Sequence, residues 1–161
     1  MRNNSAIILY RPSTDNIVWS KTGPWKFQHD VDFISDHQIS VFGNVSFRMF
    51  NNNDIPDDKQ SYVFFYDFMT NNVSVPYHNA MESMRVYTAS EGLSEVLPNG
   101  DIFIEEQNRG RLLRLTPDAV KWEFVRRVDE NNLSMPSWSR YLTEDQVRDI
   151  LPILEQSKSD Q

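Results

Sequence analysis

The sequence predicts an all-β fold: a partial β-propeller built from four-stranded antiparallel sheets, followed by a short C-terminal helix. Three observations support this prediction. Short runs rich in Val, Ile, Tyr and Phe recur along most of the chain. Turn sequences separate them, including Asn99-Gly100, the strongest short signal for a β-hairpin. The order of the paired runs also repeats, in units that start at residues 7, 63 and 112, and propeller repeats have periods of about 40 to 50 residues.

Each repeat unit is expected to place two hairpins in one sheet. The expected strands are residues 6–10, 16–19, 31–34, 38–42, 62–66, 72–75, 93–97, 101–105, 111–115 and 120–128. The three starts predict two complete blades and half of a third, which is an incomplete set of about three blades. A closed propeller usually needs at least about four blades. The chain is therefore expected to be the C-terminal part of a propeller, or alternatively a small open β domain.

Polar segments are expected to connect the blades. Residues 44–61 are rich in Asn and Asp and are expected to form one such loop. Glu105 and Glu106 are expected to leave one strand, and a turn at residues 108–110 is expected to lead from one blade to the next.

The C-terminal region has the signals of a helix. Thr143 is a good N-cap and Gln146 completes a capping box, ahead of an apolar stripe. Pro152 lies inside the stripe and is expected to kink or shorten the helix. The predicted organisation is a partial propeller over residues 1–142, a helix over 143–155 packed on or beside it, and a frayed tail over 156–161.

Composition excludes several classes of function. The 161 residues are 39% hydrophobic and 24% charged, which is typical of a globular domain. The formal net charge is −7, which argues against a nucleic-acid partner. Cysteine is absent, so no thiolate nucleophile or Cys-type metal site is available. No apolar run has membrane-spanning length, and the N-terminal residues predict no signal peptide, which leaves the localisation unknown from these residues.

The segment Gln28-His29-Asp30-Val31-Asp32 holds the strongest candidate for chemistry. A histidine serves as a base, a nucleophile or a metal ligand. Because side chains alternate along a strand, Asp30 and Asp32 are expected on the face opposite to His29, which argues against a local His–Asp dyad. From local residues alone, a structural histidine at the start of a strand is favoured.

The other candidates carry weaker signals. His37 and His78 are expected at the surface, and the three histidines lack metal-ligand spacing. Glu105 and Glu106 are adjacent acids, and they are expected in a connection between blades rather than as an acid–base pair in catalysis. Candidate anion-binding arginines are Arg109, Arg111, Arg114 and Arg140. The four tryptophans are Trp19, Trp25, Trp122 and Trp138, and the first and third are expected to pack within or between blades.

Taken together, these motifs resemble the β-propeller proteins of the arylsulfotransferase family. The resemblance rests on Gly23-Pro24-Trp25 with Gln28-His29-Asp30, and on the order of further segments. These are residues 39–44, 90–106, 110–115, 122–125 and 138–141. Together they cover most of the chain.

The resemblance implies transfer of a sulfuryl group from a phenolic sulfate ester to a phenol, with no cofactor and no nucleotide sulfate donor. It implies that His29 is the nucleophile and that Arg111 and Arg140 contact the sulfate. It also implies a longer parent that is periplasmic, secreted or membrane-anchored. The missing blades, or a second copy, are then expected as partners. Two alternatives remain: a non-catalytic propeller module that binds a ligand or protein, and, more weakly, a metal-assisted hydrolase.

Overall fold

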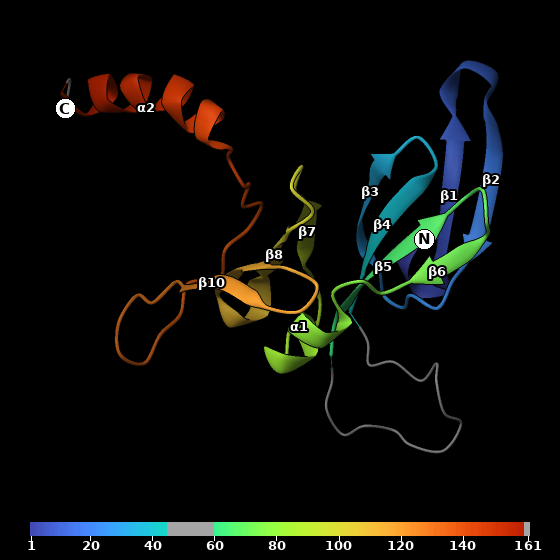
Figure 1. The fold of residues 1–161 in the computed structure, drawn as a ribbon, viewed down its shortest axis with the longest axis horizontal. Helices are drawn as coiled ribbons and strands as arrows, with labels where there is room; N and C mark the ends of the chain where they lie inside the picture. Colours follow the sequence, from blue (N-terminus) through green and yellow to red (C-terminus); the bar gives the residue numbers. More distant parts are fainter. Residues whose placement is uncertain (45–59, 160–161) are drawn as a thin grey trace.

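Three antiparallel sheets make up most of the computed structural model, which describes residues 1–44 and 60–159 (Figure 1). The strands are β1 (Ala6–Arg11), β2 (Asn16–Thr22), β3 (His29–Ser35), β4 (Gln38–Gly43), β5 (Tyr62–Asp67), β6 (Asn72–Ser74), β7 (Leu93–Val96), β8 (Ile102–Glu106), β9 (Arg111–Leu115) and β10 (Val120–Val125). Two α-helices, α1 (His78–Ser83) and α2 (Glu144–Ser159), and three short 3₁₀ turns complete the described residues. The predicted mostly-β class with a short C-terminal helix is confirmed.

The sheets follow one another along the chain. Strands β1 and β2 form a two-stranded sheet, β3 to β6 form a four-stranded sheet in sequence order, and β7 to β10 form another. Within the described residues no sheet closes into a barrel. Two four-stranded meanders and one pair of strands fit a partial, propeller-like arrangement.

The grouping of hairpins into sheets differs from the sequence prediction. Gly43 of β4 pairs with Tyr62 of β5, and Glu106 of β8 pairs with Arg111 of β9, so each four-stranded sheet starts one hairpin later than expected. The incomplete unit is therefore β1–β2 and not β9–β10. The turn after Glu106 joins two strands of one sheet instead of two blades, because a 3₁₀ turn ending at Gly110 (φ 62°) reverses the chain at once. The predicted loop over residues 44–61 falls largely on residues 45–59, which lie outside the described residues.

Apolar side chains fill the space between successive sheets. One cluster lies between β1–β2 and the β3–β6 sheet and includes Ile7, Trp25, Ile39, Val41, Phe64 and Tyr66. A second lies between the two four-stranded sheets and includes Phe42, Val63, Met81, Ile102, Ile104 and Leu113. Trp19 packs on the first cluster and Trp122 on a third that includes Phe103, as the sequence predicted for both. The sheets are therefore stacked face to face.

Close packing of β7 on the β3–β6 sheet depends on Gly92. A Cβ atom at Gly92 would lie 2.3 Å from Cε1 of the buried Phe42 ring and 2.8 Å from Cγ2 of the buried Thr88. We expect Gly92→Ala to lower the free energy of unfolding by about 2 kcal/mol, because either the ring or β7 must shift. Urea unfolding measures this. Glu91→Ala, a change in a neighbouring exposed side chain, is the control, and equal stabilities of the two variants would contradict the packing argument.

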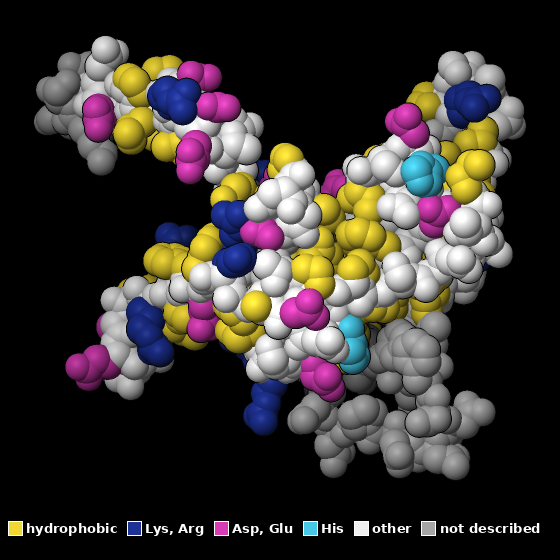
Figure 2. Space-filling model, viewed as in Figure 1, with side chains coloured by type: hydrophobic (Ala, Val, Ile, Leu, Met, Phe, Trp, Pro, Cys, Tyr) yellow, Lys and Arg dark blue, Asp and Glu magenta, His cyan; other side chains and the backbone are white. Residues whose placement is uncertain are grey.

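Helix α2 begins as predicted and ends later than predicted. The backbone N–H of Thr143 donates to Oε1 of Gln146 (2.8 Å), and the N–H of Gln146 donates to Oγ1 of Thr143 (3.3 Å), which is the expected capping box. The helix continues through Pro152 to Ser159. Figure 1 shows α2 standing apart from the sheets. Apolar side chains lie on its surface among charged ones (Figure 2), namely Val147, Ile150, Leu151, Ile153 and Leu154, which are 37–66% exposed.

Candidate functional site

Two adjoining hollows lie along the line where β3 meets β7. One, of about 570 Å³, is lined by Asp30, residues 32–34, residues 93–98 and Arg140. The other, of about 270 Å³, is lined by His29, Asp30, Glu91, Gly92, Leu93, Glu105, Gln107, Ser137 and Trp138. Asp30 and Leu93 line both. We call these two hollows the β3–β7 cleft.

His29 reaches the cleft because β3 contains a bulge. His29 pairs with Phe42 and Val31 pairs with Val41, so Asp30 is an extra residue on β3, and its φ is 50°. After the bulge, Asp32 pairs with Ser40. Since Ser40 and Phe42 share a face of β4, His29 and Asp32 also share a face. The prediction that Asp32 lies opposite to His29 was wrong, because a bulge interrupts the alternation on which it depended.

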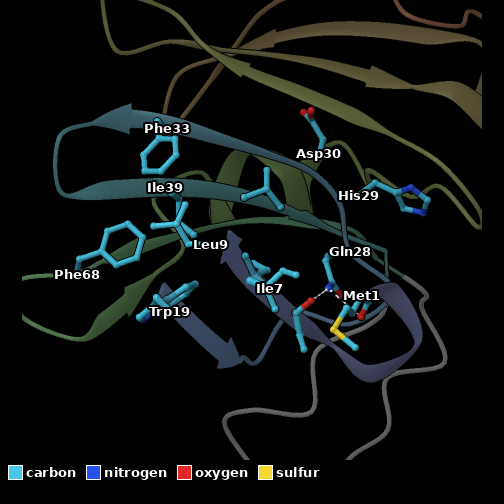
Figure 3. Close-up of a pocket in the computed structure, with 13 residues that line it drawn as sticks. Met1, Ile7, Leu9, Trp19, Gln28, His29, Asp30, Phe33, Ile39 and Phe68 are labelled. Carbon is cyan, nitrogen blue, oxygen red and sulfur yellow. Dashed lines mark hydrogen bonds between the residues drawn. The ribbon is translucent and has the colours of Figure 1, made fainter. Parts of the chain in front are cut away.

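The carboxylate of Asp30 bridges the two four-stranded sheets. Its Oδ2 atom accepts a hydrogen bond from the backbone N–H of Ser94 on β7 (2.7 Å). Figure 3 shows this carboxylate on the far side of β3 from Leu9 and Phe68. Burial raises the pKa of Asp30 from 3.8 to about 6; the Ser94 bond opposes this, as does Arg140, while Asp32 and Glu95 add to it. The charge of the Asp30 carboxyl therefore changes near neutral pH.

We expect Asp30 to make stability depend on pH between about 4 and 7. A carboxyl group with a raised pKa in the folded state binds its proton more tightly there, so its stabilising contribution is complete below pH 4 and is lost as pH rises through 6. The Asp30→Asn variant keeps an oxygen acceptor for Ser94 and carries no charge. Its unfolding free energy is expected to exceed that of the wild type by about 2 kcal/mol at pH 7.5 and to approach it at pH 3.5.

Urea unfolding at both pH values measures this difference. Asp36→Asn removes an exposed negative charge from the turn after the same strand and is the control. Parallel pH profiles for wild type and Asp30→Asn would show that the Asp30 carboxyl has no raised pKa.

A segment between β10 and α2 forms the outer wall of the cleft. The backbone N–H of Ser139 donates to Oε2 of the buried Glu105 (2.6 Å), which fixes this segment to β8. The Trp138 ring is 76% exposed, its backbone φ is 60°, and the Arg140 guanidinium lies 5.5 Å from its centroid. A left-handed backbone is unusual for a bulky residue, and such conformations cluster at functional sites. Trp138 thus presents a flat aromatic surface beside the hollow that holds His29.

Comparison with protein families assigns the chain. Residues 1–127 match the family model described as Arylsulfotransferase (ASST). The chain belongs to the arylsulfotransferase family. Neither the curated proteins nor the solved structures gave a match. The resemblance noted from the sequence motifs is confirmed at the level of the family.

In this arylsulfotransferase chain, the structure brings two of the three predicted site residues to the cleft. His29 lines one hollow and Arg140 the other. Arg111 lines neither hollow, and its guanidinium is engaged elsewhere. It bonds the fully buried Glu106 carboxylate through Nε, Glu123 Oε1 (3.0 Å) and the backbone oxygen of Met84 (3.0 Å). Sulfate binding by Arg111 stays a prediction that this geometry does not support.

The other histidines lie away from the cleft. His37 is an exposed turn residue whose Nε2 is 3.6 Å from Oδ2 of Asp67. His78 stacks on the Tyr62 ring with centroids 5.3 Å apart. Of the three histidines, all of which the structure describes, His29 alone lines the β3–β7 cleft.

Three acids of the cleft, Glu91, Glu95 and Glu105, were not predicted from the sequence to lie in a site. Glu105 and Glu106 alternate on β8, so Glu105 lines the His29 hollow whereas Glu106 lies in the Arg111 network. Glu91 lines the same hollow. The adjacent Gly92 was a usable signal, because glycine often marks a close approach of two backbones.

Residues 1–44 and 60–159 offer neither a metal-binding group nor a helix suited to a membrane. No group of three or more His, Asp or Glu side chains there is placed to hold a metal ion. Among the helices in the same residues, none is long and apolar enough to span a membrane.

Proposed function

We propose that this chain supplies the histidine of a sulfuryl-transfer site that acts on phenolic sulfates, as part of a larger propeller. Membership of the arylsulfotransferase family supports the reaction class. The observation that carries the proposal is the position of His29, the one histidine in the β3–β7 cleft among the described residues, beside the exposed Trp138 ring.

The proposed reaction has two steps at one ring nitrogen. A lone pair of the neutral His29 imidazole attacks the sulfur of an aryl sulfate, and an S–N bond forms as the aryl S–O bond breaks and the phenolate leaves. The proton on the second ring nitrogen passes to the departing phenolate, which leaves as the phenol. An acceptor phenol then attacks the same sulfur, an S–O bond forms, the S–N bond breaks, and the phenol proton restores the neutral imidazole.

Charge determines what the cleft contributes to this reaction. Stabilising a sulfuryl group requires positive donors around its oxygens. Arg140, which lines the larger hollow, is the one arginine or lysine of the cleft among the described residues. Acidic side chains occur in both hollows: Asp30, Asp32 and Glu95 line the larger, and Asp30, Glu91 and Glu105 line the smaller. We propose that further cations come from blades outside the described residues, and that this chain alone transfers sulfuryl groups slowly.

Incubation with 4-nitrophenyl sulfate tests the proposal. We expect release of 4-nitrophenol, increased by added phenol, and a protein species heavier by one SO₃ group that maps to His29. A chain that releases no 4-nitrophenol and forms no adduct, alone or with the remaining blades supplied, would contradict it.

A non-catalytic interaction module is the second candidate function. The exposed apolar side chains of α2 and the acidic cleft favour it. A specific protein or ligand complex that is unchanged by loss of His29, with no turnover in any assembly, would support this function.

A further inference from the structure

We propose that Tyr141 and Arg114 are positioning residues that hold Arg140 in the β3–β7 cleft. Tyr141 belongs to residues 137–141, which we call the strap. The strap reaches both hollows of the cleft, because its first two residues line the smaller hollow and Arg140 lines the larger. The inference rests on the proposed function where it concerns sulfuryl transfer, whereas the placement of Arg140 is measurable without turnover.

The strap has no secondary structure of its own to fix its position. It lies between β10 and α2 and forms neither a strand nor a helix. Both Trp138 and Arg140 are exposed, so burial of these side chains does not hold the strap in place. Its position therefore depends on the contacts that it makes with the face of the β7–β10 sheet that carries Phe103 and Glu105.

Two hydrogen bonds anchor the strap, one on each side of Arg140. Before this residue, the backbone N–H of Ser139 donates to Oε2 of the buried Glu105 (2.6 Å). After it, the Tyr141 hydroxyl accepts a hydrogen bond from Nη1 of Arg114 (2.6 Å). Each bond has one charged partner, and such bonds are stronger than those between neutral groups. Because Ser139 and Tyr141 are the direct neighbours of Arg140, the two anchors restrict where its backbone can lie.

Arg114 is itself held in place, so it supports Tyr141 at a fixed point of the sheet. Its Nε and Nη2 atoms both lie 2.7 Å from Oδ2 of the buried Asp101. The Tyr141 ring also packs on the buried Phe103, with ring centroids 6.1 Å apart. Arg114, which the sequence made a candidate for anion binding, therefore joins the strap to the sheet.

The anchors matter because Arg140 is the cation of the larger hollow. It shares this hollow with the carboxyl groups of Asp30, Asp32 and Glu95. Its positive charge lowers the pKa of Asp30 and so opposes the effect of burial, whereas the two other acids raise this pKa. Tyr141 lines neither hollow, so loss of its ring is expected to affect Asp30 through the placement of Arg140. The Asp30 carboxyl thus reports where Arg140 lies.

The pKa of Asp30 in the full chain, followed by its carboxyl ¹³C signal, tests the placement. Arg140→Ala is expected to raise this pKa, because a nearby positive charge is lost. Tyr141→Ala is expected to produce most of the same rise. Tyr141→Phe keeps the ring on Phe103 and loses only the hydroxyl, so a smaller rise is expected. Leu142→Ala shortens the exposed neighbour of Tyr141 and is the control, which should leave the pKa unchanged.

Three results of this titration would overturn the proposal. One is an Asp30 pKa that does not respond to Arg140→Ala, because Arg140 would then lie away from the cleft. The second is a pKa that rises in Arg140→Ala and stays at the wild-type value in both Tyr141 variants. The third is an equal rise in Leu142→Ala and Tyr141→Ala. The ¹H–¹⁵N spectrum of each variant shows whether it is folded, and Tyr141→Phe decides the question if Tyr141→Ala is not.

Turnover of 4-nitrophenyl sulfate, in whichever assembly the wild type is active, tests the catalytic consequence. Tyr141→Ala is expected to lower kcat/KM about tenfold, and Tyr141→Phe to restore part of the loss. Adding Arg140→Ala to Tyr141→Ala is expected to cause little further loss, because the displaced guanidinium no longer contacts the sulfate. Losses that multiply would overturn the positioning role. Absence of turnover in every assembly would contradict sulfuryl transfer, and the Asp30 titration would still decide the placement of Arg140.

Discussion

Replacing His29 with alanine is expected to reduce sulfuryl transfer by roughly 1000-fold or more, the scale on which removal of a nucleophile acts. The reason is specific to the two-step route. Without the imidazole, no S–N bond forms, and the phenol would have to displace the aryl group directly in a cleft lined by acids. The measurements are 4-nitrophenol release and the mass of the trapped protein, made in whichever assembly the wild-type chain is active.

The control for this variant is His37→Ala. His37 is an exposed turn residue away from the cleft, so its loss should change neither turnover nor the adduct. Since His29 is half-buried at the start of β3, urea unfolding should confirm that His29→Ala remains folded under the assay conditions. A folded His29→Ala variant with wild-type turnover would eliminate the nucleophile assignment.

The hairpins of this chain could be predicted from sequence, but their grouping into sheets could not. The turn at Asn99-Gly100 lies where expected, with the Gly100 N–H bonded to the oxygen of Leu97 (2.9 Å). Local turn chemistry determines such a hairpin. Whether β4 pairs with β5 or with another strand depends on contacts between strands that are distant in the sequence. Periodicity alone gives the length of a repeat and does not show at which strand each sheet begins. Helix α1 was missed because its six residues are too few to show a helical period.

The site was only partly predictable for a related reason. Alternation along β3 follows from sequence, but the bulge at Asp30 does not, because the left-handed backbone at that residue comes from packing between sheets. The bulge lets the Asp30 carboxylate reach Ser94, a residue 64 positions away. The ion pair of Arg111 could not be predicted either, because its buried partner Glu106 was expected in a loop. Which arginine of the family-like segments can bind an anion therefore depends on the partners that each has in the folded chain.

Replacing Arg111 with alanine is expected to destabilise the chain by about 3–5 kcal/mol, whether or not the chain transfers sulfuryl groups. Glu106 is fully buried, and Arg111 is its closest cation; Arg109 lies 3.7 Å away and the backbone N–H of Tyr87 donates to the other carboxylate oxygen at 2.6 Å. Removing Arg111 leaves a buried carboxylate with incomplete compensation, and such a loss is much costlier than that of a surface ion pair. Urea unfolding at pH 7 measures the effect.

A double-mutant cycle separates this structural role from sulfate binding. Arg111→Met combined with Glu106→Gln removes both charges, and the pair is expected to be less destabilised than the sum of the single variants, because no buried charge is left alone. Arg126→Ala, at an exposed arginine just beyond β10, should change stability by less than about 0.5 kcal/mol. If Arg111→Ala were as stable as Arg126→Ala but lost sulfuryl transfer, Arg111 would be free to bind substrate. We expect instead that Arg111 acts by holding Glu106, which leaves Arg140 to contact the sulfate in the cleft.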